Sequence, residues 1–148
     1  MRGIKGTLGT AALLAALPLS AADPMAISSN SGELQWGPCP PFFSDTCRLA
    51  VLQGNPAQRN ADVFFRLDGG DPFPMHTHTS AERMVLVQGK LVVEYDGHPA
   101  VTLEEGNYAY GPASAPHKGQ CVSEERCVLF IAFEEPVDAF AVEQAQHD

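Results

Sequence analysis

The chain has 148 residues, a formal net charge of −9 at pH 7 and 45% hydrophobic residues. This length suits one domain with a buried core. The negative charge argues against nucleic-acid backbones and anionic membrane surfaces as partners.

The N-terminus has the pattern of a secretory signal peptide. Arg2 and Lys5 give a positive start, 7–19 is an apolar run, and Ser20 and Ala22 are small residues at the −3 and −1 positions of a cleavage site. A membrane anchor or a buried first helix is the alternative, but the run is short for a bilayer span. We therefore expect secretion, to a bacterial periplasm, and no membrane association once the signal is removed.

Four cysteines follow the signal segment, and an even number in an exported chain favours disulfides. Three connectivities are possible. The most local one pairs Cys39 with Cys47 and Cys121 with Cys127, and the second pair would close a hairpin. A thiolate metal site is the alternative, although neither pair has the Cys-x-x-Cys spacing that such sites use.

The middle of the chain reads as a succession of short strands. Segments rich in Val, Leu, Phe and Tyr alternate with turns that contain Gly, Pro, Asn or Asp. Many short strands at near-regular intervals indicate an all-β sandwich or barrel. The expected strands are 48–53, 61–67, 73–78, 82–88, 90–96, 99–104, 107–111, 116–122 and 127–133.

The two ends of this β region are expected to differ from it. Val137, Phe140, Ala141 and Gln144 have helical spacing, so a short C-terminal helix is an alternative to an irregular tail. The segments we expect are a signal peptide (1–22), a leader (23–47), a barrel (48–135) and a tail or short helix (136–148). The strand over 127–133 is apolar on both faces, which calls for cover by the terminal segments or by the second subunit of a homodimer.

One stretch of the β region carries metal-binding side chains. Alternate side chains of a strand share a face, so His76 and His78 project together with Cα atoms about 6.5 to 7 Å apart. A short turn after them brings Glu82 to the start of the next strand. Two imidazoles and a carboxylate can bind one metal ion. Met84 and Leu86 share the face of Glu82 and would line an apolar cavity beside the ion.

The spacing of these residues resembles the two motifs of the cupin superfamily, and the chain looks like a small single-domain cupin. The residues that match the first motif are Gly70, His76, His78, Glu82 and Gly89. Those that match the second are Gly106, Pro112 and His117, with Ser114 in place of a glycine and Cys121 in place of an asparagine. Neither departure touches a metal ligand.

The resemblance implies a jelly-roll β-barrel with one divalent ion on four residues. The implied ligands are His76, His78, Glu82 and His117, and the ion could be Fe, Mn, Ni, Cu or Zn. The alternative is a barrel whose histidines fill the core without metal, although an unpaired Glu82 would be costly to bury. His98 and His147 are expected on the surface.

Three imidazoles and one carboxylate would leave two positions of an octahedron open, as in catalytic metal sites. Because known cupins include dioxygenases, isomerases and lyases, the resemblance implies a metal-dependent enzyme of one of these types, and we predict that it acts on a small oxygenated molecule. The alternative is a non-catalytic cupin that binds or senses a small molecule and uses its metal structurally. A purely structural interaction protein would have to explain four intact ligands.

Most of these reactions also need an acid or base. The candidates are Tyr108, Tyr110 and Glu94, with ordinary strand packing as the alternative for each tyrosine. Phe73, Met75 and Met84 are candidates for the pocket wall, or simply for core. Arg83 and Lys118 lie at odd offsets from the ligands beside them, so both should point out of the barrel.

Overall fold

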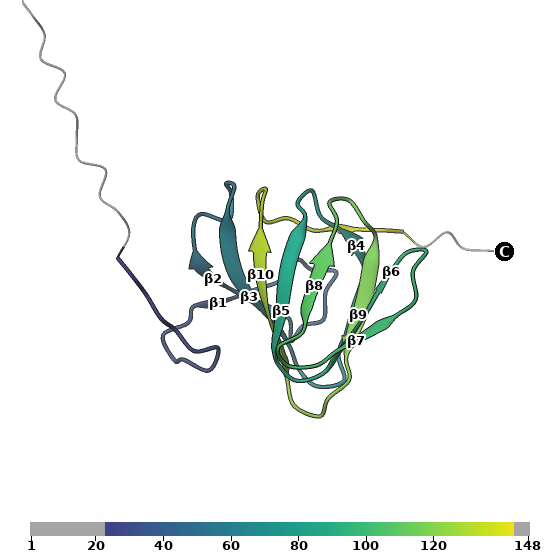
Figure 1. The fold of residues 1–148 in the computed structure, drawn as a ribbon, viewed down its shortest axis with the longest axis horizontal. Coiled ribbons are helices and arrows are strands. Elements are labelled where there is room, and N and C mark those ends of the chain that lie inside the picture. Colours follow the sequence, from purple (N-terminus) through teal and green to yellow (C-terminus); the bar gives the residue numbers. More distant parts are fainter. Residues whose placement is uncertain (1–22, 144–148) are drawn as a thin grey trace, which may run out of the picture.

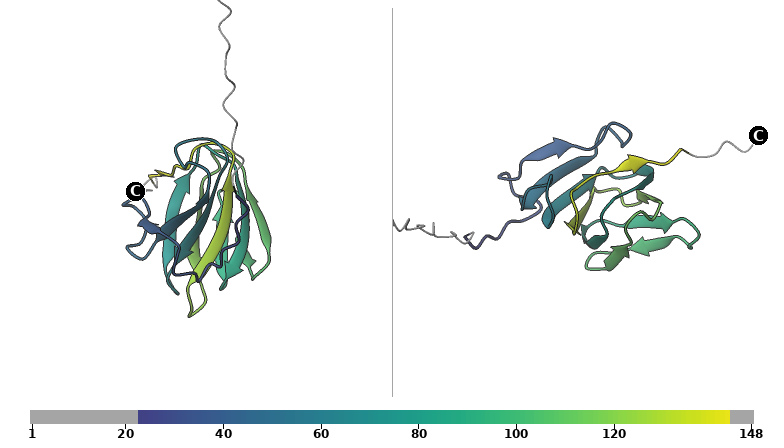
Figure 2. Two further views of the ribbon diagram at one scale, coloured as in Figure 1. Left: turned by 90° about the vertical axis from the view of Figure 1, so that its left-hand side faces the viewer. Right: turned by 90° about the horizontal axis from the view of Figure 1, so that it is seen from above.

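The computed structural model describes residues 23–143; the expected signal peptide and His147 lie outside these residues. Eleven strands and no helix occur in this part of the chain, and they form two antiparallel sheets that face each other (Figures 1 and 2). The all-β fold predicted from the sequence is therefore confirmed. The strands are β1 (Trp36–Pro38), β2 (Arg48–Gln53), β3 (Ala61–Leu67), β4 (Pro72–Thr77), β5 (Glu82–Gln88), β6 (Leu91–Tyr95), β7 (Val101–Leu103), β8 (Tyr108–Gly111), β9 (His117–Cys121), β10 (Cys127–Phe133) and β11 (Phe140–Ala141).

The larger sheet has the strand order β1-β2-β3-β10-β5-β8, and the smaller one the order β11-β4-β9-β6-β7. Strands that are distant in the sequence therefore lie side by side, as β4 and β9 do, and this places residues from both sequence motifs together. β2, β3, β5 and β10 have the bounds expected from the sequence, and the other expected strands agree within two residues.

The prediction of a short C-terminal helix was wrong for the described residues. β11 lies there instead and pairs with β4, with Phe140 opposite Thr77 and Ala141 opposite His76. The Val142 amide extends this pairing by donating to the Met75 carbonyl at 3.0 Å. An open sheet edge offers the backbone a complete set of hydrogen-bond partners, which outweighs a helical spacing of only four apolar or neutral residues.

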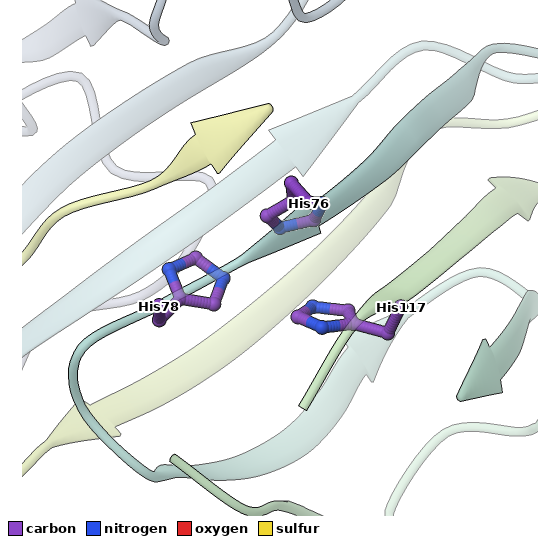
Figure 3. A group of neighbouring side chains, drawn as sticks. All are labelled: His76, His78 and His117. Carbon is purple, nitrogen blue, oxygen red and sulfur yellow. The ribbon is translucent and has the colours of Figure 1, made fainter. Parts of the chain in front are cut away.

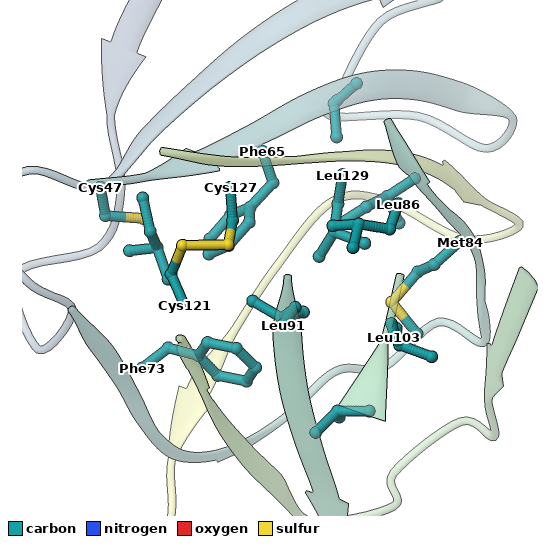
Figure 4. Close-up of a cluster of buried hydrophobic side chains, with 14 of the residues drawn as sticks. Cys47, Phe65, Phe73, Met84, Leu86, Leu91, Leu103, Cys121, Cys127 and Leu129 are labelled. Carbon is teal, nitrogen blue, oxygen red and sulfur yellow. A yellow bond between two sulfur atoms is a disulfide. The ribbon is translucent and has the colours of Figure 1, made fainter. Parts of the chain in front are cut away.

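The main core lies between the sheets, where alternate side chains of both sheets meet (Figure 4). A smaller cluster covers the outer face of β2, β3 and β10, because Leu34 of the N-terminal segment packs there with Ala50, Phe64 and Val128. Part of the second apolar face of β10 is thus covered by the same chain.

Both expected disulfides are present, Cys39–Cys47 and Cys121–Cys127. The second joins β9 to β10 and so links the two sheets covalently (Figure 4). Two disulfides suit an oxidising, extracellular location. Within residues 23–143, no helix is long and apolar enough to cross a membrane.

Candidate metal centre

Three histidines, one on β4, one just after it and one on the neighbouring β9, point toward one another between the sheets (Figure 3). His76 on β4 lies directly opposite His117 on β9, and His78 follows just after the end of β4. One ring nitrogen from each residue lies within 4.8 Å of the other two, and all three residues are buried. The strand pairing, rather than closeness in sequence, brings His117 to the other two.

Glu82 reaches the same point from the opposite sheet. It is the first residue of β5 and only 4% exposed. Its Oε1 lies 3.4 Å from His78 Nε2 and its Oε2 lies 3.5 Å from His117 Nε2. The structure thus brings together all four residues that the sequence motifs singled out.

Each imidazole is oriented by a hydrogen bond to the backbone. The Nδ1 atoms of His76 and His117 lie 2.7 Å from the Pro74 carbonyl and 3.1 Å from the Ala115 carbonyl, and His78 Nδ1 meets the Asp138 carbonyl. Because a carbonyl only accepts, Nδ1 must donate in each ring. The three Nε2 atoms are then left with free lone pairs, the arrangement that metal-binding histidines use.

Burial sets the protonation of these groups. It lowers the pKa of His76 to about 3 and that of His117 to about 4, and it also lowers the pKa of His78. It raises the pKa of Glu82 to about 8. The imidazoles are therefore neutral at pH 7, as metal binding requires, whereas Glu82 keeps its proton until a cation replaces it.

A second observation also indicates that these four residues suit a metal ion. His78 Nε2 is buried and has no hydrogen-bond partner among the described residues, although Glu82 is close. Such an orphaned acceptor costs free energy unless a ligand satisfies it. An ion bound between the three Nε2 atoms and Glu82 would satisfy it.

The turn before His117 shows how the departure from the second motif is accommodated. Ser114 has a φ of 61°, a left-handed conformation that glycine adopts at least cost. Its amide donates to the His78 carbonyl at 2.8 Å, which holds this turn against the segment that carries His78.

Residues 25–136 match the family described as the ChrR cupin-like domain. The chain belongs to this cupin family. No curated protein matches it.

Solved structures with this fold include several enzymes. The DMSP lyase DddQ from Ruegeria pomeroyi DSS-3 is similar with a TM-score of 0.65 and 17% identity, over 77% of this chain and 64% of that one. The polyketide cyclase RemF from Streptomyces resistomycificus is similar with a TM-score of 0.66 and 14% identity, over 82% of this chain and 89% of that one. A cupin-2 domain from Rhodospirillum rubrum is similar with a TM-score of 0.66 and 12% identity, over 83% of this chain and 84% of that one. This cupin spans less than two thirds of the matched DMSP lyase chains, and identities this low show the fold alone.

A cavity of about 130 Å³ adjoins the four residues and lies between the sheets. Phe73 and Met84 border it, as predicted for the pocket wall, whereas Met75 does not. Leu86 was also expected beside the cavity, but it lies fully buried in the core and does not border it. Apolar side chains form nearly all of the remaining wall.

The structure does not bring the three acid or base candidates to this cavity. Tyr108 and Tyr110 are 61% and 53% exposed on β8. Glu94 pairs with Lys118 at the surface, at 3.5 Å. Arg83 also points outward, as expected, and pairs with Glu134. His98 is exposed, as its place in a turn predicted.

Two residues beside the centre were missed in the sequence. Tyr95 shares the inward face of β6 with Leu91 and Val93, and this parity could have identified it in place of Glu94. Asp138 supplies the carbonyl for His78 and also accepts the Thr79 amide through Oδ1, at 2.8 Å. No spacing signal points to Asp138, because it follows His78 by 60 residues.

Proposed function

We propose that this cupin is a metal-dependent enzyme acting on a small oxygenated molecule, with one divalent ion held by His76, His78, Glu82 and His117. The observation that carries the proposal is the convergence of one ring nitrogen from each of three histidines next to a buried carboxylate and a cavity, with each Nδ1 bonded to a backbone carbonyl. The ligand set suits Fe, Mn, Ni, Cu or Zn. When bound, such an ion supplies Lewis acidity or redox chemistry.

The chain's own residues prepare this site in three ways. Backbone carbonyls fix the imidazole tautomers, burial keeps the rings neutral, and apolar side chains line most of the adjoining cavity. An apolar lining lowers the local dielectric constant and so strengthens electrostatic interactions beside it. Proteins of this fold named as a lyase, a cyclase and an oxalate oxidase support a dioxygenase, isomerase or lyase type of reaction.

A second candidate is a binding or sensing cupin without turnover. It is favoured by the cavity wall, where the described residues offer one acid besides Glu82, and that acid, Asp138, already accepts the Thr79 amide. For either candidate we propose secretion to a bacterial periplasm, supported by the two disulfides and by the signal-like N-terminal sequence.

Elemental analysis of protein purified from an oxidising compartment tests the metal site. We expect about one equivalent of a divalent metal in the wild type and in a His98→Ala control. His76→Ala and His117→Ala should lose the metal while circular dichroism shows an intact β fold. A full equivalent of metal in purified His76→Ala would refute the site.

Turnover separates the two candidates. The metal-loaded protein is incubated with small oxygenated molecules, and its metal spectrum and the products are followed together. Product formation that is lost in His117→Ala supports the enzyme. Spectral changes without any product support the binding protein.

A further inference from the structure

The cavity beside the four residues is polar on one side only. Its polar border consists of the three histidines, Glu82 and Asp138, and the Asp138 carboxylate is already engaged by the Thr79 amide. Aromatic and aliphatic side chains form the rest of the wall. Among them are Phe65, Phe73, Leu103, Leu129, Ile131 and Phe133. A ligand must therefore place its polar atoms at the histidine side and its apolar body against this wall.

No lysine or arginine of the described chain borders the cavity. The two cations adjacent in sequence to the centre, Arg83 and Lys118, point outward and pair with Glu134 and Glu94. A negative group placed away from the histidine side would consequently be buried without a partner. Burial of an unpaired charge is strongly unfavourable, so such a ligand would be rejected.

The charge at the histidine side sets the charge of the ligand. With neutral imidazoles and an ionised Glu82, a divalent ion would leave one net positive charge in a buried site. One negative charge on the ligand compensates it. A dianion would leave a net negative charge beside apolar walls, which is costly in a low dielectric.

The volume sets the size of the apolar body. The cavity measures about 130 Å³. An engineered apolar protein cavity of about 150 Å³ binds benzene. One six-membered ring is therefore about the largest body that the cavity itself holds, and a second fused ring would have to extend through its open side.

We propose that the site takes a monoanionic molecule that chelates through two oxygen atoms and carries an apolar body about the size of one benzene ring. This inference rests on the proposed metal site, and it adds the charge, donor set and size of the ligand. Small dianionic chelators are disfavoured by their charge, and bulkier aromatic chelators by the size of the cavity.

Hydroxamic acids provide the test, because each binds as a monoanion through two oxygens while the attached body varies. Titration calorimetry on the zinc-loaded, disulfide-intact protein compares acetohydroxamate, benzohydroxamate, 2-naphthohydroxamate and oxalate. Each affinity is expressed relative to that for zinc free in buffer. Benzohydroxamate should exceed acetohydroxamate by about tenfold or more, because its ring leaves water for an apolar wall. The relative affinities for 2-naphthohydroxamate and oxalate should be lower than that for benzohydroxamate by at least the same factor.

Variants of β7 test whether the preference for benzohydroxamate comes from the cavity wall. Leu103→Ala enlarges the cavity and should raise the relative affinity for 2-naphthohydroxamate. Val101→Ala, at the exposed start of β7 and outside the cavity lining, should leave all ratios unchanged. If Leu103→Ala does not fold, Leu103→Phe offers the opposite change. Leu103→Phe should lower the relative affinity for benzohydroxamate and leave that for acetohydroxamate unchanged.

A metal-free measurement keeps this inference distinct from the metal site. Toluene should raise the Tm of the metal-free protein, and naphthalene should not. Binding of toluene by a protein that takes up no metal would refute the proposed function and, with it, the chelating part of this inference. Equal relative affinities for acetohydroxamate and benzohydroxamate, or no response to toluene, would overturn the inference while leaving the metal site intact.

Discussion

The ring of Tyr95 stacks on the imidazole of His117, with centroids 4.9 Å apart and planes inclined by 29°. The two residues face each other across the paired strands β6 and β9. The Tyr95 hydroxyl is buried and has no hydrogen-bond partner in the described chain. A Cβ added to Gly111 would lie 2.4 Å from this hydroxyl and 3.2 Å from Glu82 Oε2, so both groups border the same small space.

Tyr95→Phe is the first prediction. Burial, and secondarily the charge of Glu82, raises the pKa of Tyr95, so the phenol stays a hydrogen-bond donor at neutral pH. When Glu82 gives one oxygen to a metal ion, Tyr95 can donate to the other oxygen. Removing such an outer partner lowers metal affinity by about tenfold or more. Chelator competition measures the affinity.

The metal-free protein serves as a control that separates an effect of Tyr95 on metal binding from an effect on the fold. Its Tm should be unchanged or higher in Tyr95→Phe, because the variant removes an unsatisfied hydroxyl. Tyr110→Phe, on the exposed face of β8, should change neither quantity. Wild-type metal affinity in Tyr95→Phe would show that Tyr95 serves only as packing.

Gly111→Ala is the second prediction, and it follows from the same contact. The added Cβ would meet the Tyr95 hydroxyl at 2.4 Å, so ring or strand must move. We expect a loss of about 1 to 3 kcal/mol in unfolding free energy, the usual cost of overpacking. Combination with Tyr95→Phe should recover part of it, since the closest atom is then absent. Denaturant unfolding measures both, with Gly37→Ala, whose Cβ meets nothing closer than 3.9 Å, as control. Equal losses in the single and double variants would contradict the clash.

The third prediction concerns pH and the metal-free protein. Burial raises the pKa of Glu82 from 4.5 to about 8. A group whose pKa is raised by folding contributes stability that is complete below its unfolded pKa and is lost as the pH rises through the folded pKa. The free energy of unfolding of the wild type should therefore fall relative to that of Glu82→Gln as the pH rises from about 4.5 to about 8, by up to about 1.4 kcal/mol per pH unit.

Three histidines face Glu82, and their lowered pKa values affect stability in the opposite direction, mainly below about pH 6.5. Because these residues are present in both proteins, their contribution largely cancels in the comparison. Denaturant unfolding at a series of pH values measures the difference. A difference that does not change with pH would show that Glu82 is ionised even without a cation.

The sequence predicts the strands and the four clustered residues for a physical reason. Period-two patterns with turn residues between them mark β2, β3, β5 and β10 to the residue, and alternate spacing places His76 and His78 on one face. Tyr95 opposite His117 depends on which strands pair, and this is set by long-range topology. β11 was missed because its two residues become a strand only by pairing with the edge of β4. Local patterns carry no information on such pairings.

The fourth prediction concerns the segment that follows β10 and fixes His78. The Asp138 carbonyl accepts from His78 Nδ1, and Asp138 Oδ1 accepts the Thr79 amide at 2.8 Å. Asp138→Ala removes the side-chain bond and frees the segment that orients the imidazole. We expect a loss of about 1 kcal/mol in unfolding free energy and a fall of about tenfold in metal affinity. Asp138→Asn keeps an acceptor oxygen and should retain most of both. If Asp138→Ala binds metal as tightly as the wild type, β11 and the rest of the fold alone hold His78 in place.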